Sequence, residues 1–280
     1  MALESPQNQI LLSARLSVRY GDKPVLRDVQ LEIRRGEVLG LVGQSGSGKS
    51  TLAMAILGLL EKKRAHAEGT IHFQDSDLLQ LSERDLRALR GRAVALVLQS
   101  PLSSLNPALK IRTQLKETWR AHASGSGADC ADAIRKSLES VSLPADNEFL
   151  RKYPSQMSVG QAQRVLIAMA VMHRPVLLIA DEATSALDVI TQSEILALFR
   201  ELNRSTGMAI LYISHDLASV AGICDRIAIL HQGAIVEYGT AGQIFTKPQH
   251  EYTQRLMAAL LRIQPPSVPF STKAEAAAAR

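Results

Sequence analysis

A glycine-rich loop between a strand and a helix constrains this chain more than any other feature of its sequence. Residues 43–50 read Gly-Gln-Ser-Gly-Ser-Gly-Lys-Ser and fit the pattern G-x-x-x-x-G-K-[ST]. The apolar run Val38–Val42 before the loop predicts a strand buried on both faces, and residues 49–60 after it have the composition of a helix. In that order, strand, loop and helix form the context in which this pattern binds phosphate groups.

Each residue type in the loop has a chemical reason to be there. Gly46 and Gly48 let the backbone wrap with its N–H groups pointing inward, and side chains at these positions would obstruct the phosphates. The following helix adds the positive end of its dipole. We expect Lys49 to reach the β- and γ-phosphates and the Ser50 hydroxyl to bind Mg²⁺. The expected nucleotide contacts in the loop are Gly43, Ser45, Gly46, Ser47, Gly48, Lys49, Ser50 and Thr51.

A second apolar run ends in two acidic residues. Residues 176–180 predict a strand, and Asp181 and Glu182 follow it directly. Charged groups at the end of a buried strand are costly unless they have a role there. Asp181 fits the role of holding Mg²⁺, directly or through water, and Glu182 fits a general base that polarises an attacking water. Two solvated acids at a loop are the alternative for this pair taken alone.

The rest of the chain alternates between strand and helix patterns, apart from one helical stretch. Short-period alternation over residues 11–33 predicts antiparallel β-structure, with a turn at Gly21 and Asp22. Residues 110–160 are polar and helical, which we interpret as a helical insertion. Further helices are expected at 82–90, 161–173, 190–205, 217–222 and 250–263, and further strands at 69–73, 94–98, 208–213, 226–231 and 234–238.

Composition excludes several classes of protein. The 280 residues are 46% hydrophobic and 21% charged, which is typical of a folded globular chain and wrong for a disordered one. The net charge of +5 is too small and scattered to indicate nucleic-acid binding, and 4% aromatic residues disfavour base stacking. No apolar run nears the roughly 20 residues that a bilayer crossing needs. Cys130 and Cys224 show no metal-ligand spacing, and a reduced state is favoured over a single disulfide.

With these motifs in place, the chain resembles the nucleotide-binding subunit of ATP-binding cassette (ABC) transporters up to about residue 262. The distinguishing segment is Ser158-Val159-Gly160-Gln161, with Met157 ahead of it, which looks like the LSGGQ signature. The resemblance implies that Ser158, Gly160, Gln161 and the start of the following helix bind the γ-phosphate held by a partner subunit's loop. Met157 replaces the leucine, and Val159 replaces the first glycine, which restricts the backbone and places two methyl groups near the nucleotide.

The resemblance also assigns roles to residues elsewhere in the chain. Tyr20 looks like the aromatic residue that stacks on adenine, beside the simpler reading of a tyrosine at a strand end. Gln99 looks like the Q-loop glutamine, and Asp188 ends a Ser-Ala-Leu-Asp segment that looks like the D-loop of the dimer interface. His215 looks like the switch histidine, which bonds the γ-phosphate and orients Glu182 and water. The implied cofactors are ATP and Mg²⁺, with Ser50, Gln99 and Asp181 as the metal ligands.

The implied fold is α/β: a P-loop NTPase (RecA-like) core with an N-terminal antiparallel β subdomain and a helical insertion subdomain. We expect a single ABC ATPase domain followed by a flexible tail. The expected segments are the whole domain at 1–262, its core at about 1–99 and 161–246, the helical subdomain at about 100–160, the C-terminal helix at about 250–263 and the tail at 264–280.

Two local segments narrow the resemblance. Residues 99–107 resemble the Q-x-P-x-x-S-L-N-P run of dipeptide, oligopeptide and nickel import ATPases. Residues 248–256 resemble their P-x-H-P-Y-T-x-x-L segment, with Glu251 in place of the second proline. No cysteine follows Cys224, so we expect no iron–sulfur cluster. The resemblance points to a bacterial importer of peptides, nickel or a metal chelate, with this chain peripheral on the cytoplasmic face of the inner membrane.

The family arrangement implies a second ATPase subunit, identical or not, two membrane permeases and an external solute-binding protein. Two ATPase subunits would sandwich two ATP molecules, and closure and opening of that dimer would move the permeases. An alternative from another class is a soluble ABC ATPase that acts on ribosomes or DNA. ABC ATPases of that class usually carry a second cassette, long coiled coils or zinc modules. This chain has one cassette and neither insertion, so we expect no nucleic-acid partner. A third reading, suggested only by Val159, is a poorly hydrolysing regulatory subunit.

Overall fold

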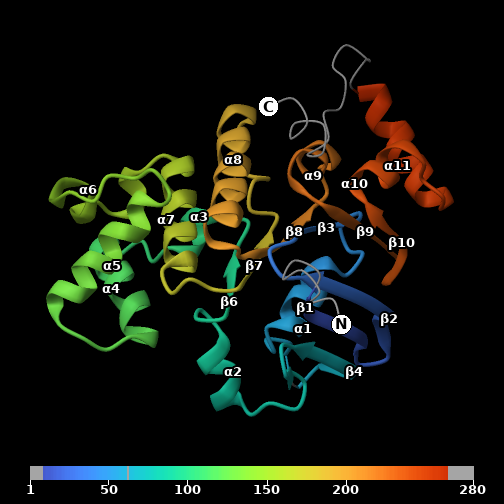
Figure 1. Cartoon of the computed structure of the whole chain (residues 1–280), viewed down its shortest axis with the longest axis horizontal. Helices are drawn as coiled ribbons and strands as arrows, with labels where there is room; N and C mark the ends of the chain where they lie inside the picture. The colour runs from blue at the N-terminus through green and yellow to red at the C-terminus, as the bar shows by residue number, and fades with distance from the viewer. Residues whose placement is uncertain (1–8, 62, 264–280) are drawn as a thin grey trace, which may run out of the picture. The chain divides into compact units, whose positions relative to one another are not determined.

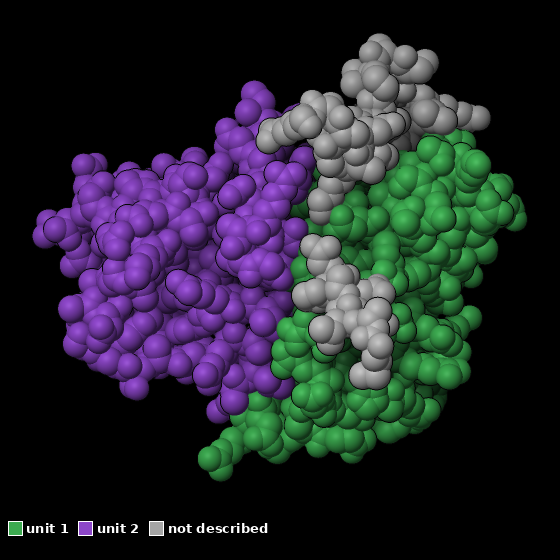
Figure 2. All heavy atoms as spheres, in the orientation of Figure 1, with its two compact units in different colours: residues 1–86, 209–280 green, residues 87–208 purple. Residues whose placement is uncertain are grey.

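The computed structural model describes residues 9–61 and 63–263, which fold into two compact units (Figures 1 and 2). Unit 1 comprises residues 1–86 and 209–280, and unit 2 comprises residues 87–208. The chain leaves unit 1 within helix α2 (Glu83–Leu89) and returns to it at strand β8 (Ala209–Ser214). The predicted tail at 264–280 lies outside the described residues.

Unit 1 contains an antiparallel sheet with the strand order β2-β1-β4-β5. Strands β1 (Ile10–Tyr20) and β2 (Lys23–Arg34) form a hairpin around Gly21, as the short-period alternation predicts. Strand β4 (Ala65–Phe73) begins before the predicted residue 69, because it pairs with β1 as far as the end of that strand. The short strand β5 is Ser76–Asp77.

The other strands of unit 1 lie in the order β10-β9-β3-β8. Strand β3 (Val38–Val42) pairs in parallel with β8 and with β9 (Arg226–His231), and all its residues are buried, as predicted for a central strand. Strand β10 (Ala234–Thr240) completes the predicted hairpin with β9. The helices of this unit are α1 (Lys49–Ile56), α9 (Leu217–Ile223), α10 (Ala241–Thr246) and α11 (Glu251–Ile263).

Unit 2 is mostly helical and contains one pair of parallel strands, β6 (Val94–Val97) and β7 (Leu177–Asp181). The predicted helical stretch between residues 110 and 160 is confirmed (Figure 1). Within this stretch, Ser126 and Asp129 form a reciprocal capping box at the start of α5 (Gly127–Glu139). The helices are α3 (Pro101–Ser104), α4 (Ile111–His122), α5 (Gly127–Glu139), α6 (Asn147–Arg151), α7 (Val159–Val171) and α8 (Val189–Thr206), with a 3₁₀ turn at Pro154–Gln156.

Two further features bear on the sequence expectations. Cys130 and Cys224 are both buried and free, as the composition favoured. Among the helices of the described part of the chain, none combines the length and the apolar character that a membrane span requires.

Candidate functional site

The glycine-rich loop connects β3 to α1, in the arrangement that the sequence predicts. Gly48 stands at the N-cap of α1 with φ 109°, and a Cβ there would lie 2.5 Å from Leu26 Cδ2. A Cβ on Gly43 would lie 2.2 Å from the carbonyl oxygen of Leu230. Both positions therefore require glycine, for the backbone conformation in one case and for close packing in both.

The start of α1 is suited to an anion. No side chain caps this helix, and its first turn carries no acidic residue. Its N-terminal N–H groups and the positive end of its dipole are thus left for a ligand of negative charge. Gly46 has φ 79° and open space where a Cβ would stand, so the loop keeps room for phosphate oxygens. These features fit the triphosphate that the sequence predicts.

Lys49 is held against the loop that it follows. Its side chain is buried, and Nζ donates to the carbonyl oxygens of Gly43 at 2.8 Å and Gln44 at 3.1 Å. The ammonium group is thus fixed beside the glycine cradle. Such a preplaced cation needs little rearrangement to reach the phosphates of a bound nucleotide.

The sheet register brings His215 to the same edge as the loop. Strands β3 and β8 are parallel, and Val42 pairs with Ser214. Gly43 and His215 directly follow these two residues, so the phosphate loop and the histidine leave the carboxyl ends of neighbouring strands. His215 is exposed there, and Asp216 after it caps α9 by accepting the N–H of Ala218 at 3.0 Å. This placement fits the switch role that the family resemblance implies.

Tyr20 lies at the tip of the β1–β2 hairpin and is half-buried. It pairs with Lys23 of β2, and Leu26 further along β2 packs against Gly48 of the phosphate loop. The hairpin that carries Tyr20 therefore contacts the loop. Its adenine-stacking role stays a prediction.

In unit 2, a pair of parallel strands brings Gln99 and Asp181 to one sheet edge. Strands β6 and β7 are parallel, with Val97 opposite Ala180. Gln99 follows β6 and Asp181 ends β7, so both lie at the carboxyl edge of this strand pair. Asp181 is buried and Gln99 is exposed. Carboxylate and amide oxygens are ligands that Mg²⁺ accepts in proteins, so the donor types of Asp181 and Gln99 fit that ion.

Glu182 has a strained backbone that the sequence does not reveal. Its φ of 49° lies in the left-handed region, which costs a residue other than glycine on the order of 1–3 kcal/mol. Ser185 holds this turn, because its N–H and its hydroxyl both donate to the Glu182 carbonyl oxygen, at 3.1 and 3.0 Å. Strain of this kind concentrates at functional sites, which is consistent with a general base at this position.

The signature segment begins a helix. Ser158 is the N-cap of α7, and it exchanges hydrogen bonds of 3.1 and 3.2 Å with Gln161, so α7 begins at Val159 rather than at the predicted residue 161. Val159 is 38% exposed, so its side chain is only partly covered by the rest of the chain. The roles of Ser158, Gly160 and Gln161 toward a partner's nucleotide stay predictions.

The signature helix and the D-loop helix are in close contact at Gly160. A Cβ on Gly160 would lie 2.7 Å from Thr191 Cγ2 in α8. Thr191 Oγ1 donates to Asp188 at 2.7 Å, and Asp188 also caps α8 by accepting the N–H groups of Ile190 and Thr191. The hydrogen bonds from Thr191 hold the pKa of the Asp188 carboxyl below its ordinary value. Thr191 is thus a structural part of the site that sequence reasoning missed.

This contact predicts an unusual response to Gly160→Ala. Alanine in a helix normally gains about 1 kcal/mol over glycine. Here the new methyl group meets Thr191 Cγ2, and rotation of Thr191 would break its hydrogen bond to Asp188, so we expect a net loss of about 1–2 kcal/mol in the free energy of unfolding, measured in urea. Adding Thr191→Ser removes Cγ2, keeps Oγ1 and should restore stability. Gly127→Ala at the start of α5, where a Cβ meets nothing, is the control; a stabilised Gly160→Ala chain would contradict the contact.

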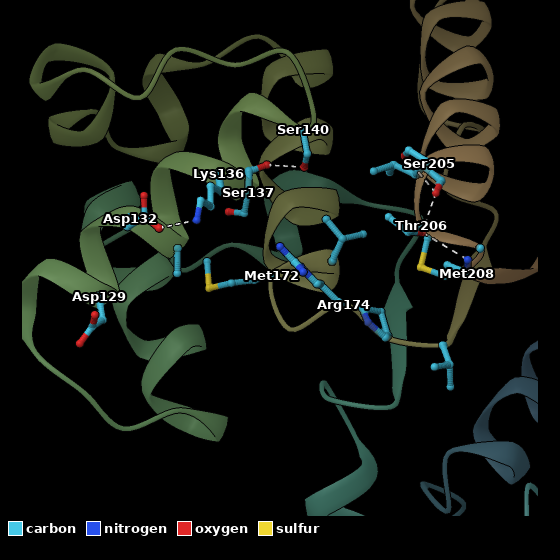
Figure 3. Close-up of a pocket in the computed structure, with 16 residues that line it drawn as sticks. Asp129, Asp132, Lys136, Ser137, Ser140, Met172, Arg174, Ser205, Thr206 and Met208 are labelled. Carbon is cyan, nitrogen blue, oxygen red and sulfur yellow. Dashed lines mark hydrogen bonds and ion pairs between the residues drawn. The ribbon is translucent and has the colours of Figure 1, made fainter.

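Unit 2 contains a cavity of about 810 Å³ (Figure 3). Residues of α5 and the ends of α7 and α8 line it. Its polar groups largely satisfy one another: Lys136 pairs with Asp132 at 2.7 Å, and the Ser140 hydroxyl donates to the Ser137 carbonyl at 2.8 Å. None of the residues predicted to bind nucleotide or metal lines this cavity.

The structure thus gathers the predicted residues in two groups, one in each unit. Sequence reasoning missed two contributors, Thr191 and Tyr252 of α11, whose hydroxyl accepts the Gln44 N–H of the phosphate loop. The only sequence signal for Tyr252 is its place in the segment 248–256. Unit 1 holds Tyr20, the loop residues 43–51 and His215, and unit 2 holds Gln99, Ser158, Gly160, Gln161, Asp181, Glu182 and Asp188.

Comparison with known proteins supports the family resemblance that the sequence motifs indicate. The profile of the family described as "ABC transporter" matches residues 26–185. The oligopeptide transport ATP-binding protein OppD of Salmonella typhimurium is 40% identical over 262 residues, which are 92% of this chain and 78% of that protein. The dipeptide transport ATP-binding protein DppD of Haemophilus influenzae is 42% identical over 88% of this chain and 76% of that protein. The peptidoglycan transport ATP-binding protein YejF of Agrobacterium fabrum is 44% identical over 94% of this chain, which spans 50% of that relative's length.

The solved structures that resemble this chain are also ABC cassettes. An ATP-binding cassette in a dimeric, post-hydrolysis state bound to ADP and Pi aligns with a TM-score of 0.72 at 26% identity, over 82% of this chain and 98% of that one. The protein cbiO1 from Clostridium perfringens, part of the ABC transporter complex cbiONQ, aligns with a TM-score of 0.75 at 25% identity, over 91% of this chain and 98% of that one. The α/β P-loop NTPase fold is confirmed, and this chain belongs to the ABC transporter family.

Proposed function

We propose that this chain is the ATP-hydrolysing subunit of a bacterial importer for peptides, and that residues 1–262 act as one cassette. The observation that carries the nucleotide assignment is the register of β3 and β8, which places the phosphate loop and His215 at one sheet edge. The substrate class is supported by segments 99–107 and 248–256 and by the relatives named for oligopeptide and dipeptide transport. Nickel or a metal chelate is the second substrate class.

Binding of ATP would use the loop and α1 together. The N–H groups around Gly46 and Gly48 donate to phosphate oxygens, and the dipole of α1 stabilises their charge. Lys49 keeps its hydrogen bond to the Gly43 carbonyl and turns its other two ammonium donors to the β- and γ-phosphates. Ser50, Gln99 and Asp181 would hold Mg²⁺, which when bound neutralises phosphate charge as the terminal bond breaks.

Hydrolysis would then depend on Glu182 and His215. The Glu182 carboxylate accepts a proton from the attacking water, whose oxygen attacks the terminal phosphorus while ADP leaves. His215 donates a hydrogen bond toward the γ-phosphate and fixes the position of the water. The turn at Ser185 keeps the carboxylate from relaxing into a different loop conformation.

A second ATPase subunit would complete the site. Beside the signature and the D-loop, the side chains of Val159, Val189 and Ile190 are 38%, 81% and 74% exposed. Apolar residues this exposed at the signature segment and directly after the D-loop suit a protein interface. The remaining partners are two permeases and, indirectly, a solute-binding protein, which would hold this chain at the cytoplasmic face of the inner membrane.

Co-purification tests this assignment. A tagged chain, expressed in a bacterium with its neighbouring genes and extracted from membranes in mild detergent, should carry two permeases and an ATPase of the same family. Recovery with ribosomes or DNA instead would support the soluble alternative. In the purified complex, the solute-binding protein loaded with a di- or oligopeptide should raise ATP turnover, and stimulation by nickel alone would reassign the substrate. Comparing the isolated chain with the pair tests the regulatory reading.

A further inference from the structure

The first turn of α11 lies against the phosphate loop. Tyr252, the second residue of α11, is 4% exposed, and its hydroxyl accepts the Gln44 N–H at 3.3 Å. Its ring stacks on His231 at the end of β9, with centroids 3.8 Å apart and planes 20° apart. The proposed function assigns no role to this contact, although Tyr252 lies within the segment 248–256.

The Gln44 N–H that binds Tyr252 belongs to the same peptide group as the carbonyl that holds Lys49 of the phosphate loop. The Gln44 N–H and the Gly43 carbonyl belong to one planar unit, and that carbonyl accepts from Lys49 Nζ at 2.8 Å. Tyr252 and Lys49 therefore bind opposite ends of one rigid group. Fixing its N–H fixes the direction of its carbonyl, and hydrogen bonds in series strengthen one another.

Tyr252 is itself held firmly. The Glu237 carboxylate of β10 accepts the N–H groups of Gln249 at 2.7 Å and His250 at 3.0 Å, and His250 Nδ1 accepts the Tyr252 N–H at 3.1 Å. Burial alone would raise the pKa of Glu237, but hydrogen bonds to its carboxylate, those from the Gln249 and His250 amides among them, outweigh burial and leave the pKa below its ordinary value. A negatively charged carboxylate near the N-terminus of α11 also interacts favourably with the dipole of that helix. The hydroxyl of Tyr252 thus has a fixed position from which to act on the loop.

We propose that Tyr252 is a positioning residue for nucleotide binding, whose hydroxyl orients the Gly43–Gln44 peptide and, through it, the Lys49 ammonium. Tyr252 acts through the loop backbone and not on the phosphates. The inference rests on the proposed function, since it assumes that the loop binds ATP. It also gives the tyrosine of the segment 248–256 a defined role.

The test is Tyr252→Phe, which removes the hydroxyl and keeps the ring on His231. Loss of one hydrogen bond should raise the Kd for a fluorescent ATP analogue and the KM for ATP about three- to tenfold, with kcat changed less than about twofold. A cavity of about 420 Å³ borders Tyr252 and Gln44, so water can replace the acceptor and keep the effect in this range. Amide exchange of Gln44, followed by NMR, should become faster.

Tyr238→Phe is the matched control, because the Tyr238 hydroxyl donates to the Glu32 carbonyl at 2.7 Å in the same unit. It should leave the Kd for the analogue unchanged. An equal rise in Kd for both variants would overturn the proposal, as would a Tyr252→Phe chain whose Kd and Gln44 amide exchange both match the wild type.

If Tyr252→Phe unfolds, the wild-type chain still tests the contact. Slower amide exchange at Gln44 than at Ser45 supports the contact, and equally fast exchange overturns it. A wild-type chain that does not bind the analogue would instead refute the proposed function.

Discussion

Lys49→Ala is expected to abolish measurable ATP binding. The ammonium group would make charge-assisted hydrogen bonds to two phosphates, each worth about 1.5–3 kcal/mol. Their loss amounts to about 3–6 kcal/mol, which raises Kd by roughly a hundredfold to ten-thousandfold. Titration with a fluorescent ATP analogue measures the effect directly.

The control for Lys49→Ala is Lys247→Ala, which removes the same charge from an exposed position at the end of α10. It should bind the analogue like the wild-type chain. Lys49 also donates to the Gly43 and Gln44 carbonyls, so a thermal melt must accompany the titration. A folded Lys49→Ala chain with unchanged Kd would show that the loop is not the phosphate site.

Glu182→Gln should separate binding from hydrolysis. Glutamine keeps the size of the side chain and tolerates the same backbone, but it cannot accept the proton of the attacking water. General-base catalysis contributes about 10²–10⁴ in rate, so kcat should fall by at least about a hundredfold while Kd for ATP stays within about threefold. Phosphate release at saturating MgATP, alongside the analogue titration, checks both quantities.

Glu201→Gln offers a matched comparison for Glu182→Gln, since it neutralises an exposed glutamate on α8 in the same unit. Its turnover should equal that of the wild-type chain. Full activity in the Glu182→Gln chain would remove that residue from the role of base. A large fall in ATP affinity would instead mean that Glu182 contributes to binding.

Much of the fold follows from local patterns, and the errors have local causes. The strand Val38–Val42 has the predicted bounds, because an unbroken apolar run between polar residues fits a strand covered on both faces. The helix predicted at 49–60 ends at Ile56, since Gly58 takes φ 62° and breaks the helical backbone. Helix α7 starts before residue 161, because Ser158 caps it and the two residues between join its first turn.

The residues of the candidate site were predictable, but several of their contacts were not. Sequence order alone placed Asp181 and Glu182 after a strand, while the left-handed backbone of Glu182 depends on the turn closed by Ser185. Gln44 and Tyr252 are 208 positions apart, and no local period reports such a pairing. Contacts of this kind are set by tertiary packing, which short sequence patterns do not encode.

A methyl group of Thr191 lies so close to Gly160 that a Cβ on that glycine would stand 2.7 Å from it, so the starts of α7 and α8 touch at this point. Since Gly160 has no side chain that could move aside, a displacement of the start of α8 toward α7 would press directly on the start of α7. The signature segment and the D-loop would then move together in that direction. A neighbouring subunit that pressed on the D-loop would therefore also displace the signature segment.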